Sequence, residues 1–171
     1  MTSLSELVRA RRTTKVFGPE PVDPETIADL LELARWAPNH HLTNPWRFRV
    51  LGPDARAALK EAAGPESAAK LDRAPTLIVA SSASEDDDPQ TAEEDLLATG
   101  VASYIVLLAA HARGLAGYWR TPAVLRTPEG RRAAGIADGE DVVGLLHLGL
   151  PRQDKEPPER EPVDTVVEFL A

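Results

Sequence analysis

The sequence contains no cysteine, and this absence removes several kinds of chemistry at once. Disulfide bonds, thiolate nucleophiles, zinc knuckles and cysteine-bound iron–sulfur clusters all require the missing side chain. If a chain without cysteine carries out redox chemistry, a bound organic cofactor must carry the electrons.

Basic residues are fewer than acidic ones. The chain has 19 Lys and Arg and 27 Asp and Glu, which gives a formal net charge of −8. A general nucleic-acid binder needs a basic face that displaces counterions from phosphates. We therefore expect no nucleic-acid partner, although one small basic pocket is compatible with this net charge.

Long apolar runs are also missing. The longest one, Val101–Ala110, is interrupted by Ser103 and Tyr104, and a membrane-spanning helix needs ~20 apolar residues. The first residues, MTSLSELVRARR, lack the apolar stretch of a signal peptide. We expect no membrane partner, a cytoplasmic protein, and a single domain over residues 1–171 without internal repeats.

Local signals predict where helices begin and end. Ser3–Glu6 has the S-x-x-E form of a capping box, and the helix that follows should end at or just after Arg11. Asp23-Pro24 is typical of an N-cap followed by proline at the first helical position, and this second helix should end by Pro38. Three shorter helices are predicted at about 54–63, 66–71 and 127–134.

Four segments have the pattern of β-strands. Trp46–Val50 alternates apolar and cationic side chains, as a half-buried strand does. Thr76–Ala80 and Val142–Leu148 are apolar almost throughout, which is typical of strands covered on both faces. A short fourth strand is predicted within residues 117–122. Strands that alternate with helices at irregular spacing predict the α+β class.

The longest predicted helix runs from about Thr91 to Arg113 and ends before Gly114. Its second half is apolar on nearly every face, and a chain of this size has little core in which to bury it. Burial in the interface of a symmetric homodimer is a simpler explanation for the apolar surface of this helix. From about residue 150 a charged, proline-interrupted arm follows, and its apolar end, 163–170, favours a strap that docks on another surface.

No metal site is expected. Residues 84–95 carry seven acidic side chains, but the glycine spacing of a calcium loop is missing. A solvated loop that leads into a helix N-terminus explains these acids, since the helix dipole favours them there. His40 and His41 are adjacent, and adjacent histidines rarely converge on one ion.

Four polar segments combine cations, hydroxyls and aromatic rings. They are RRTTK at 11–15, HHLTNPW at 40–46, YWRTP at 118–122, and the arm with Arg152 and Arg160. Guanidinium groups bind phosphate in a bidentate manner, and a lysine supplies a point charge. A phosphate monoester with an attached ring would use all of these groups. RRTTK taken alone also fits a solvated helix end.

Three of these segments, together with an apolar fourth one, occur in an order that is typical of one family. The motifs are RRTTKVFGPEPV, LLELARWAPNHHLTNPWRF, GYWRTP and VVGLLHLGLP, and they are spread over residues 11–151. On these motifs the chain resembles the FMN-dependent nitroreductase family, in particular its short single-domain branch. The resemblance implies a central mixed or antiparallel sheet flanked by helices. It also implies a homodimer whose subunits exchange their C-terminal arms, about 150–171.

The resemblance assigns the basic segment to the FMN phosphate. Arg11, Arg12 and Thr13 would bind the ribityl phosphate, with Arg160 of the arm nearby. Lys15 would lie at the N1–O2 edge of the flavin ring, where a cation stabilises the negative charge of the reduced state. No residue is expected to be a catalytic acid, base or nucleophile, because FMN carries the chemistry.

The remaining implied cofactor contacts come from two other segments. His40 and Asn44 would reach the flavin from the partner subunit. Trp119, Arg120 and Thr121 would lie along the ring, where backbone amides can donate to N5.

The other histidines and one tryptophan have no implied role. His111 and His147 lie in apolar segments and are expected to be satisfied residues of the core or the interface. Trp46 is expected in the core.

The implied activity is that of an FMN oxidoreductase. NADH or NADPH would act as a transient reductant, and hydride would pass through flavin N5 to a small planar acceptor, such as a nitroaromatic or a quinone, in ping-pong order. Other flavin chemistry of the family (enone reduction, dehydrogenation, dehalogenation) stays open. So do a flavin-binding protein without meaningful turnover and a structural dimer.

The chain departs from the family in two places. Pro122 stands where many close relatives have glycine, and it lacks the N–H that a flavin contact would use. The insertion that covers the site in larger members is reduced to something near 84–95, or is missing. No G-x-G-x-x-G segment is present, so the sequence does not separate NADH from NADPH.

Overall fold

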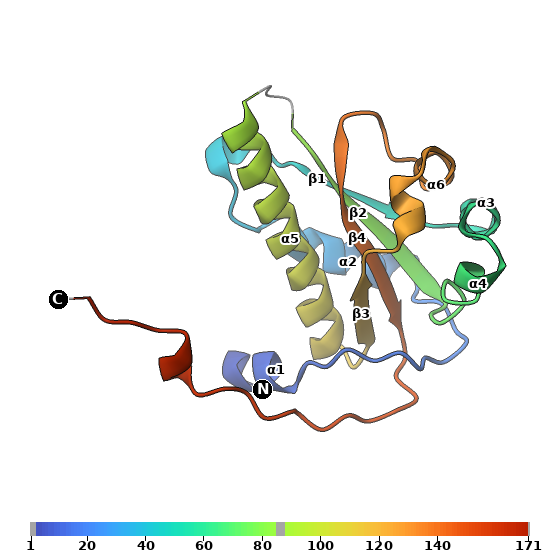
Figure 1. Cartoon of the computed structure of the whole chain (residues 1–171). Coiled ribbons are helices and arrows are strands. Elements are labelled where there is room, and N and C mark those ends of the chain that lie inside the picture. The colour runs from blue at the N-terminus through green and yellow to red at the C-terminus, as the bar shows by residue number, and fades with distance from the viewer. Residues whose placement is uncertain (1–2, 85–87, 171) are drawn as a thin grey trace.

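The centre of the protein is an antiparallel sheet of four strands in the order β1-β2-β4-β3 (Figure 1). The structure is a computed structural model that describes residues 3–84 and 88–170. The strands are β1 (Trp46–Val50), β2 (Thr76–Ala83), β3 (Ala116–Arg120) and β4 (Glu140–Gly149). All three strand pairs are antiparallel, which confirms the α+β class and decides between the mixed and antiparallel sheets that were expected.

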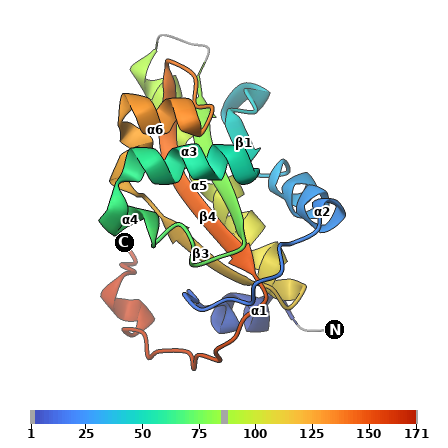
Figure 2. The same cartoon turned by 90° about the vertical axis from the view of Figure 1, so that its right-hand side faces the viewer.

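Helices cover both faces of this sheet (Figures 1 and 2). On one face α2 (Pro24–Ala34) and α5 (Pro89–Ala112) bury Leu146 and Leu148 of β4. On the other face, residues 53–68 and 128–133 form α3 (Pro53–Ala63), α4 (Pro65–Ala68) and α6 (Pro128–Ala133), and Leu145 lies in this second core. The alternation of β4 side chains between two cores explains why the strand is apolar almost throughout.

The predicted helix caps are present. α1 (Leu4–Ala10) begins with a reciprocal capping box, in which Ser3 N donates to Glu6 Oε2 at 2.6 Å and Glu6 N donates to Ser3 Oγ at 3.2 Å. Asp23 caps α2 by accepting from Thr26 N at 2.8 Å. Arg11 is the C-cap of α1, so the basic segment begins where the helix ends.

Three elements are longer than predicted. One is β4, which was predicted at 142–148 and spans Glu140–Gly149. β2 continues through Ser81–Ala83, because these polar residues still pair with β1 and β4, and Ser81 Oγ accepts from Arg49 at 2.8 Å. α5 begins at Pro89, since Asp88 caps it by accepting from Thr91 N at 3.0 Å. Residues 85–87 of the predicted acidic loop lie outside the described residues.

The second half of helix α5 is apolar on nearly every face. Among the described residues it is the one helix long and apolar enough, by length and composition alone, to cross a membrane, although half of its most apolar stretch is buried in the protein. A buried core helix passes the same test. Leu97, Val101 and Tyr104, spaced as one helical face, remain 64%, 43% and 36% exposed. This helix therefore has an uncovered apolar side in the single chain.

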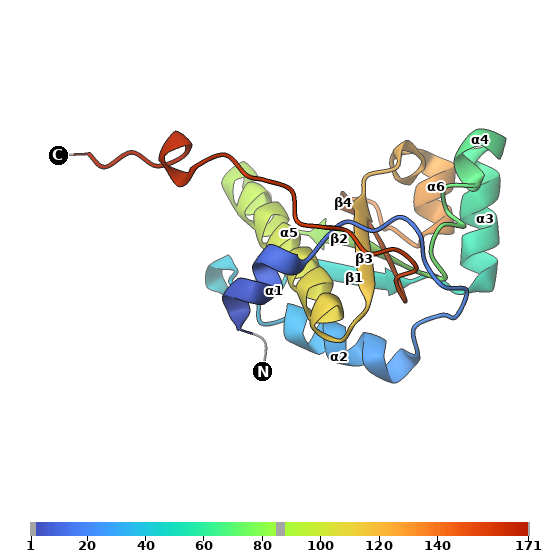
Figure 3. The same ribbon diagram turned by 90° about the horizontal axis from the view of Figure 1, so that it is seen from below.

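The C-terminal arm leaves the body of the protein beside the segment that follows α1 (Figures 1 and 3). Phe17 and Pro151 form an isolated bridge, and Arg152 N donates to Val16 O at 3.2 Å. Beyond this point every described residue of the arm is exposed, and Phe169 reaches 95%. One 3-10 turn, η3 (Val163–Thr165), interrupts the extended arm. Docking of the arm on another surface stays a prediction.

Candidate functional site

The basic segment 11–15 runs along β3, which is an edge strand of the sheet. Thr13 and Gly117 form a parallel bridge, and Thr14 N donates to Gly117 O at 3.4 Å. An extended segment directs successive side chains to opposite sides. Arg11, Thr13 and Lys15 therefore face one side of the segment.

Two cations on this first side lie over aromatic rings. The Arg11 guanidinium carbon is 5.9 Å from the ring centroid of Tyr104, and Lys15 Nζ is 5.6 Å from that of Tyr118. Within residues 3–84 and 88–170 neither cation pairs with a carboxylate. Thr13, between them, is exposed. Unpaired cations, a hydroxyl and aromatic faces suit an anionic ligand that carries a ring.

The second side of the segment faces a partly open hollow of about 230 Å³. Arg12, Thr14 and His111 line it, together with Asp154 and other residues. The Arg12 Nε atom is buried without a hydrogen-bonding partner. Burial, followed by the charges of Arg11 and Arg12, lowers the pKa of His111. In the sequence the two arginines form one basic cluster, but in the structure their side chains have different surroundings.

Lys155 ties the arm to the basic segment. Its Nζ donates to the carbonyl oxygen of Thr13 at 2.9 Å. Arg12 Nη1 donates to the carbonyl oxygen of Arg11 at 2.7 Å. Two cations thus hold the backbone of the segment from the side opposite Arg11 and Lys15.

Strand β3 contributes backbone rather than side-chain groups to its free edge. Trp119 Nε1 donates to Val143 O at 3.1 Å, so the ring is engaged inside the fold. The Gly117 carbonyl points outward to Thr14, and alternation along the strand directs the N–H of Trp119 to the same outer edge. Thr121 follows, exposed, beyond the strand. The missing N–H of Pro122 does not affect the Trp119 amide.

Arg120 and His147 lie close to this edge. Arg120 Nη1 donates to Lys70 O at 3.4 Å. His147 is fully buried, with its ring 5.4 Å from that of Tyr118. Burial, with the charges of Arg120, Arg73 and Arg56, lowers the pKa of His147 to about 3.

The expectation that His147 is a satisfied core residue is wrong in one respect. The side chain is in the core, but both ring nitrogens lack a hydrogen-bonding partner. Its cross-strand neighbours are Leu77 and Tyr118. Neither forms a hydrogen bond with the imidazole, so burial leaves the ring nitrogens without partners.

The segment with His40 and Asn44 forms a strained loop against the first half of α5. The loop contains a 3-10 turn, η1 (His40–Leu42), and His40 Nδ1 pairs with Glu94, which lowers the pKa of that carboxyl group. Asn44 Nδ2 donates to Leu42 O at 2.7 Å. His41, Leu42 and Asn44 have φ angles of 48°, 55° and 49°, which cost of order 1–3 kcal/mol each for residues other than glycine.

A single chain does not bring all the predicted residues together. Arg11 lies over Tyr104, whereas His40 contacts Glu94, ten positions earlier on α5 and so ~15 Å away along the helix axis. Arg160 lies in the exposed arm and makes no hydrogen bond or ion pair with the part of the chain that is described. The structure therefore joins the basic segment to β3 but leaves the His40 loop and Arg160 apart from them.

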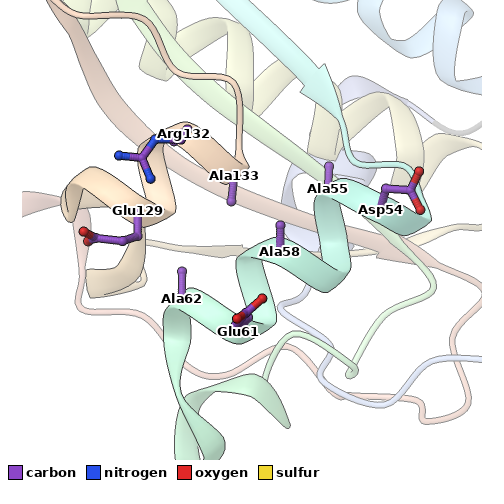
Figure 4. Close-up of a pocket in the computed structure, with 8 residues that line it drawn as sticks. All are labelled: Asp54, Ala55, Ala58, Glu61, Ala62, Glu129, Arg132 and Ala133. Carbon is purple, nitrogen blue, oxygen red and sulfur yellow. The ribbon is translucent and has the colours of Figure 1, made fainter.

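Other hollows contain none of the predicted residues or are open surfaces. A groove of about 790 Å³ lies between α3 and α6. Figure 4 shows the methyl groups of Ala58 and Ala133 pointing toward one another, with charged side chains at the edges. In the described parts of the chain no group of three His, Asp or Glu side chains could hold a metal ion.

Sequence reasoning gave no role to three residues of the site. Tyr104 and Tyr118 support the two cations, and Lys155 holds Thr13 across a separation of 142 positions. No local pattern links residues so far apart. The aromatic residue next to each cation becomes visible only once β3 and α5 are packed together.

The fold is α+β, and a basic segment lies along its edge strand β3. Comparison with known proteins gives the family: the chain matches the Nitroreductase family over residues 8–67 and 62–150. YdjA of Escherichia coli is 30% identical over 89% of this chain and 90% of its own length. YfhC of Bacillus subtilis is 27% identical over 94% and 90%. Both carry provisional names as NAD(P)H nitroreductases. The chain belongs to the Nitroreductase family.

Solved structures agree with this assignment. A nitroreductase-like family protein from Bacillus cereus superposes with a TM-score of 0.89, at 25% identity, over 99% of this chain and 97% of its own. A nitroreductase from a Sphigopyxis strain, named as FMN- and NADPH-dependent, has a TM-score of 0.81 over 99% of this chain and all of its own. At 18% identity the second likeness shows the fold alone.

Proposed function

We propose that this protein is an FMN-dependent oxidoreductase that uses NADH or NADPH to reduce small, planar, electron-poor acceptors such as nitroaromatics or quinones. Family membership and the NAD(P)H nitroreductase names of its relatives support the reaction class. The observation that carries the proposal is the pair of unpaired cations, Arg11 and Lys15, each over a tyrosine beside an edge strand.

The residues on the first side of the basic segment suit FMN. Arg11 and Thr13 would hold the phosphate, because a guanidinium and a hydroxyl are strong donors to phosphate oxygens. Lys15 would hold the N1–O2 edge of the ring. Arg12, on the opposite side, would support them through the backbone, and through its partnerless Nε if that atom reaches the phosphate.

Strand β3 would supply the wall of the ring site. The N–H of Trp119 points to its free edge and would serve as a donor to the ring, with Arg120 and Thr121 at the end of the strand. When bound, FMN supplies the chemistry of accepting and donating hydride at N5. The protein has to position two planar molecules and favour negative charge near Lys15.

A two-fold dimer would complete the site. The apolar face of Leu97, Val101 and Tyr104 lies between the His40 end and the Arg11 end of α5. If two copies of α5 pack antiparallel through this face, the His40 loop of one chain approaches the Arg11 segment of the other. His40 and Asn44 would then contact the partner's flavin, which explains why they lie apart from the other site residues in one chain.

The C-terminal arm would be exchanged in this dimer. Its apolar end is exposed in the single chain, with Val166 at 80% and Leu170 at 84%. Burial of such side chains on the partner would stabilise the assembly, at ~25 cal/mol per Å² of apolar surface. Arg160 would then approach the partner's site rather than its own. We propose a cytoplasmic protein without nucleic-acid or membrane partners.

An anaerobic titration tests the activity. The protein is saturated with FMN, freed of excess, and mixed with NADH or with NADPH while the visible flavin absorption is recorded. We expect at least one nicotinamide to bleach the flavin and a nitroaromatic or quinone to restore its colour. Bound flavin that neither nicotinamide bleaches would contradict the proposal and indicate a flavin-binding protein without turnover.

A further inference from the structure

Asp95 is a buried carboxyl group that the proposed reaction does not use. It lies on the inner face of α5 and is 1% exposed. Thr43 Oγ1 donates to its Oδ1 atom at 2.6 Å, whereas Oδ2 is buried and has no hydrogen-bonding partner among the residues that the structure describes. No ion pair joins Asp95 to a cation within the described ranges. A carboxyl group is costly to bury with one oxygen unsatisfied, so this arrangement indicates a role for the remaining contact.

That contact is the inner attachment of the His40 loop. Asn39 Oδ1 accepts from Asn44 N at 2.9 Å and lies 3.4 Å from Thr43 Oγ1. A hydroxyl has one proton to donate, and the shorter contact with Asp95 takes it. His40 pairs with Glu94 on the exposed side. Two consecutive acids of α5 therefore hold the loop, Glu94 from outside and Asp95 from inside.

The conformation of the loop needs such an attachment. His41, Leu42 and Asn44 all have φ angles near +50°, and none of them is glycine. Left-handed conformations at residues other than glycine persist only where the surrounding structure holds them. Two side-chain contacts join this loop to α5. From the strand side, Arg47 Nη1 of β1 donates to Asn44 O at 2.9 Å.

We propose that Asp95 is a positioning residue, which through Thr43 holds the strained loop of His40 and Asn44 in the shape that meets the flavin of the partner subunit. This inference rests on the proposed function, because it assigns the loop to FMN. Asp95 acts through Thr43 and does not itself touch the cofactor.

Four variants separate positioning from simple core stability. Thr43→Val keeps the shape and removes the donor, and Asp95→Ala removes the acceptor. Thr43→Ser keeps the hydroxyl. Thr99→Val is the control, because the Thr99 hydroxyl contacts the same residue but donates to the Asp95 backbone carbonyl at 2.9 Å, within α5.

Two readouts are made on each full-length variant: the dissociation constant of FMN, from quenching of its fluorescence, and amide hydrogen exchange over residues 39–45. Thr43→Val and Asp95→Ala should weaken FMN binding about tenfold or more, and loop exchange should rise. Thr43→Ser and Thr99→Val should resemble the unmodified protein in both measurements.

The outcomes are distinct. If Thr43→Val binds FMN as tightly as Thr99→Val does, and the loop exchanges at the same rate, the positioning role of Asp95 is wrong while the proposed function stands. If the unmodified protein binds no FMN, both the proposed function and this inference fall.

Discussion

Arg11 and Arg12 are neighbours in the sequence, but their side chains occupy opposite sides of an extended segment. Arg11 lies over Tyr104 on one side, and Arg12 lines the partly open hollow on the other side with Thr14. The motif RRTTK predicted a basic cluster near the end of the first helix, and the structure confirms its place. It did not predict that the two side chains have different surroundings, because that depends on the bridge between Thr13 and Gly117.

Removal of Arg11 tests this difference. Arg11→Ala should weaken FMN binding by ~1.5–3 kcal/mol, the usual worth of a hydrogen bond to a charged group. Arg9→Ala is the control, since Arg9 is an exposed cation in the last turn of the same helix. Fluorescence titration of FMN measures both variants. Equal affinities for the two would place the phosphate elsewhere.

His147 makes stability depend on pH. Its pKa is about 3 in the folded protein and ordinarily near 6.5, so the unfolded chain binds the extra proton between these values. Above pH 6.5 the ring is neutral in both states and adds no pH dependence. As the pH falls from 6.5 toward 3, the unfolded chain gains this proton, and the free energy of unfolding decreases by up to ~1.4 kcal/mol per pH unit. His147→Leu should remove this slope between pH 6.5 and 5, as measured by urea unfolding.

The same variant should be at least as stable as the unmodified protein at pH 7, because it replaces a buried polar ring without partners by an apolar side chain. His41→Leu changes an exposed histidine and serves as the control. An unchanged slope in His147→Leu would show that other groups, such as His111 and the carboxyl groups with lowered pKa values, cause the acid sensitivity.

At the scale of elements, Gly144 of β4 has no side chain, and this lets β3 approach β4 closely. A Cβ on Gly144 would lie 2.3 Å from Trp119 Nε1 and 2.6 Å from Arg120 O. A Cβ on Gly100 of α5 would meet the same tryptophan at 3.9 Å, an ordinary contact distance. Both glycines thus lie beside Trp119, but only Gly100 has room for a Cβ atom.

Alanine substitution should therefore have opposite effects at these positions. Gly144→Ala should destabilise the fold by ~1–3 kcal/mol, because the strand edge must move. Gly100→Ala should stabilise it by ~0.5–1 kcal/mol, because glycine disfavours helix interiors. Urea unfolding of both variants measures the difference. Destabilisation of similar size in both would contradict the packing described for Trp119.

Much of the element pattern was predictable from local signals. The caps at Ser3 and Asp23 and the apolar run at 76–80 needed no tertiary information. Ser81–Ala83 was missed because polar residues extend β2 only when Arg49 and Glu140 satisfy Ser81. The contact of Thr43 with Asp95 spans 52 positions, and the link from Lys155 to Thr13 spans 142. Such pairs depend on the finished fold.

For the whole molecule, the exposed face of α5 is the central feature. Leu97 is an apolar residue of this helix, and 64% of it is exposed in the single chain. Leu97→Lys should leave the single chain folded, because the side chain is not in its core, but should prevent dimerisation and weaken FMN retention. Val50→Lys, at a residue 46% exposed on β1, is the matched control and should change neither property.

Circular dichroism and light scattering of both variants test this prediction. A Leu97→Lys protein that still forms the same dimer would place the interface on another surface. A Leu97→Lys monomer that binds FMN as tightly as the unmodified protein would show that one chain completes the site.

The central claim is that two chains together enclose FMN. Size-exclusion chromatography of the FMN-saturated protein, with light scattering and flavin absorption recorded on the same peak, tests it most directly. We predict that flavin elutes with a species of twice the 18.5 kDa chain mass, at one FMN per chain. A protein peak without flavin absorption, or flavin bound to a species of the single-chain mass, would contradict the account.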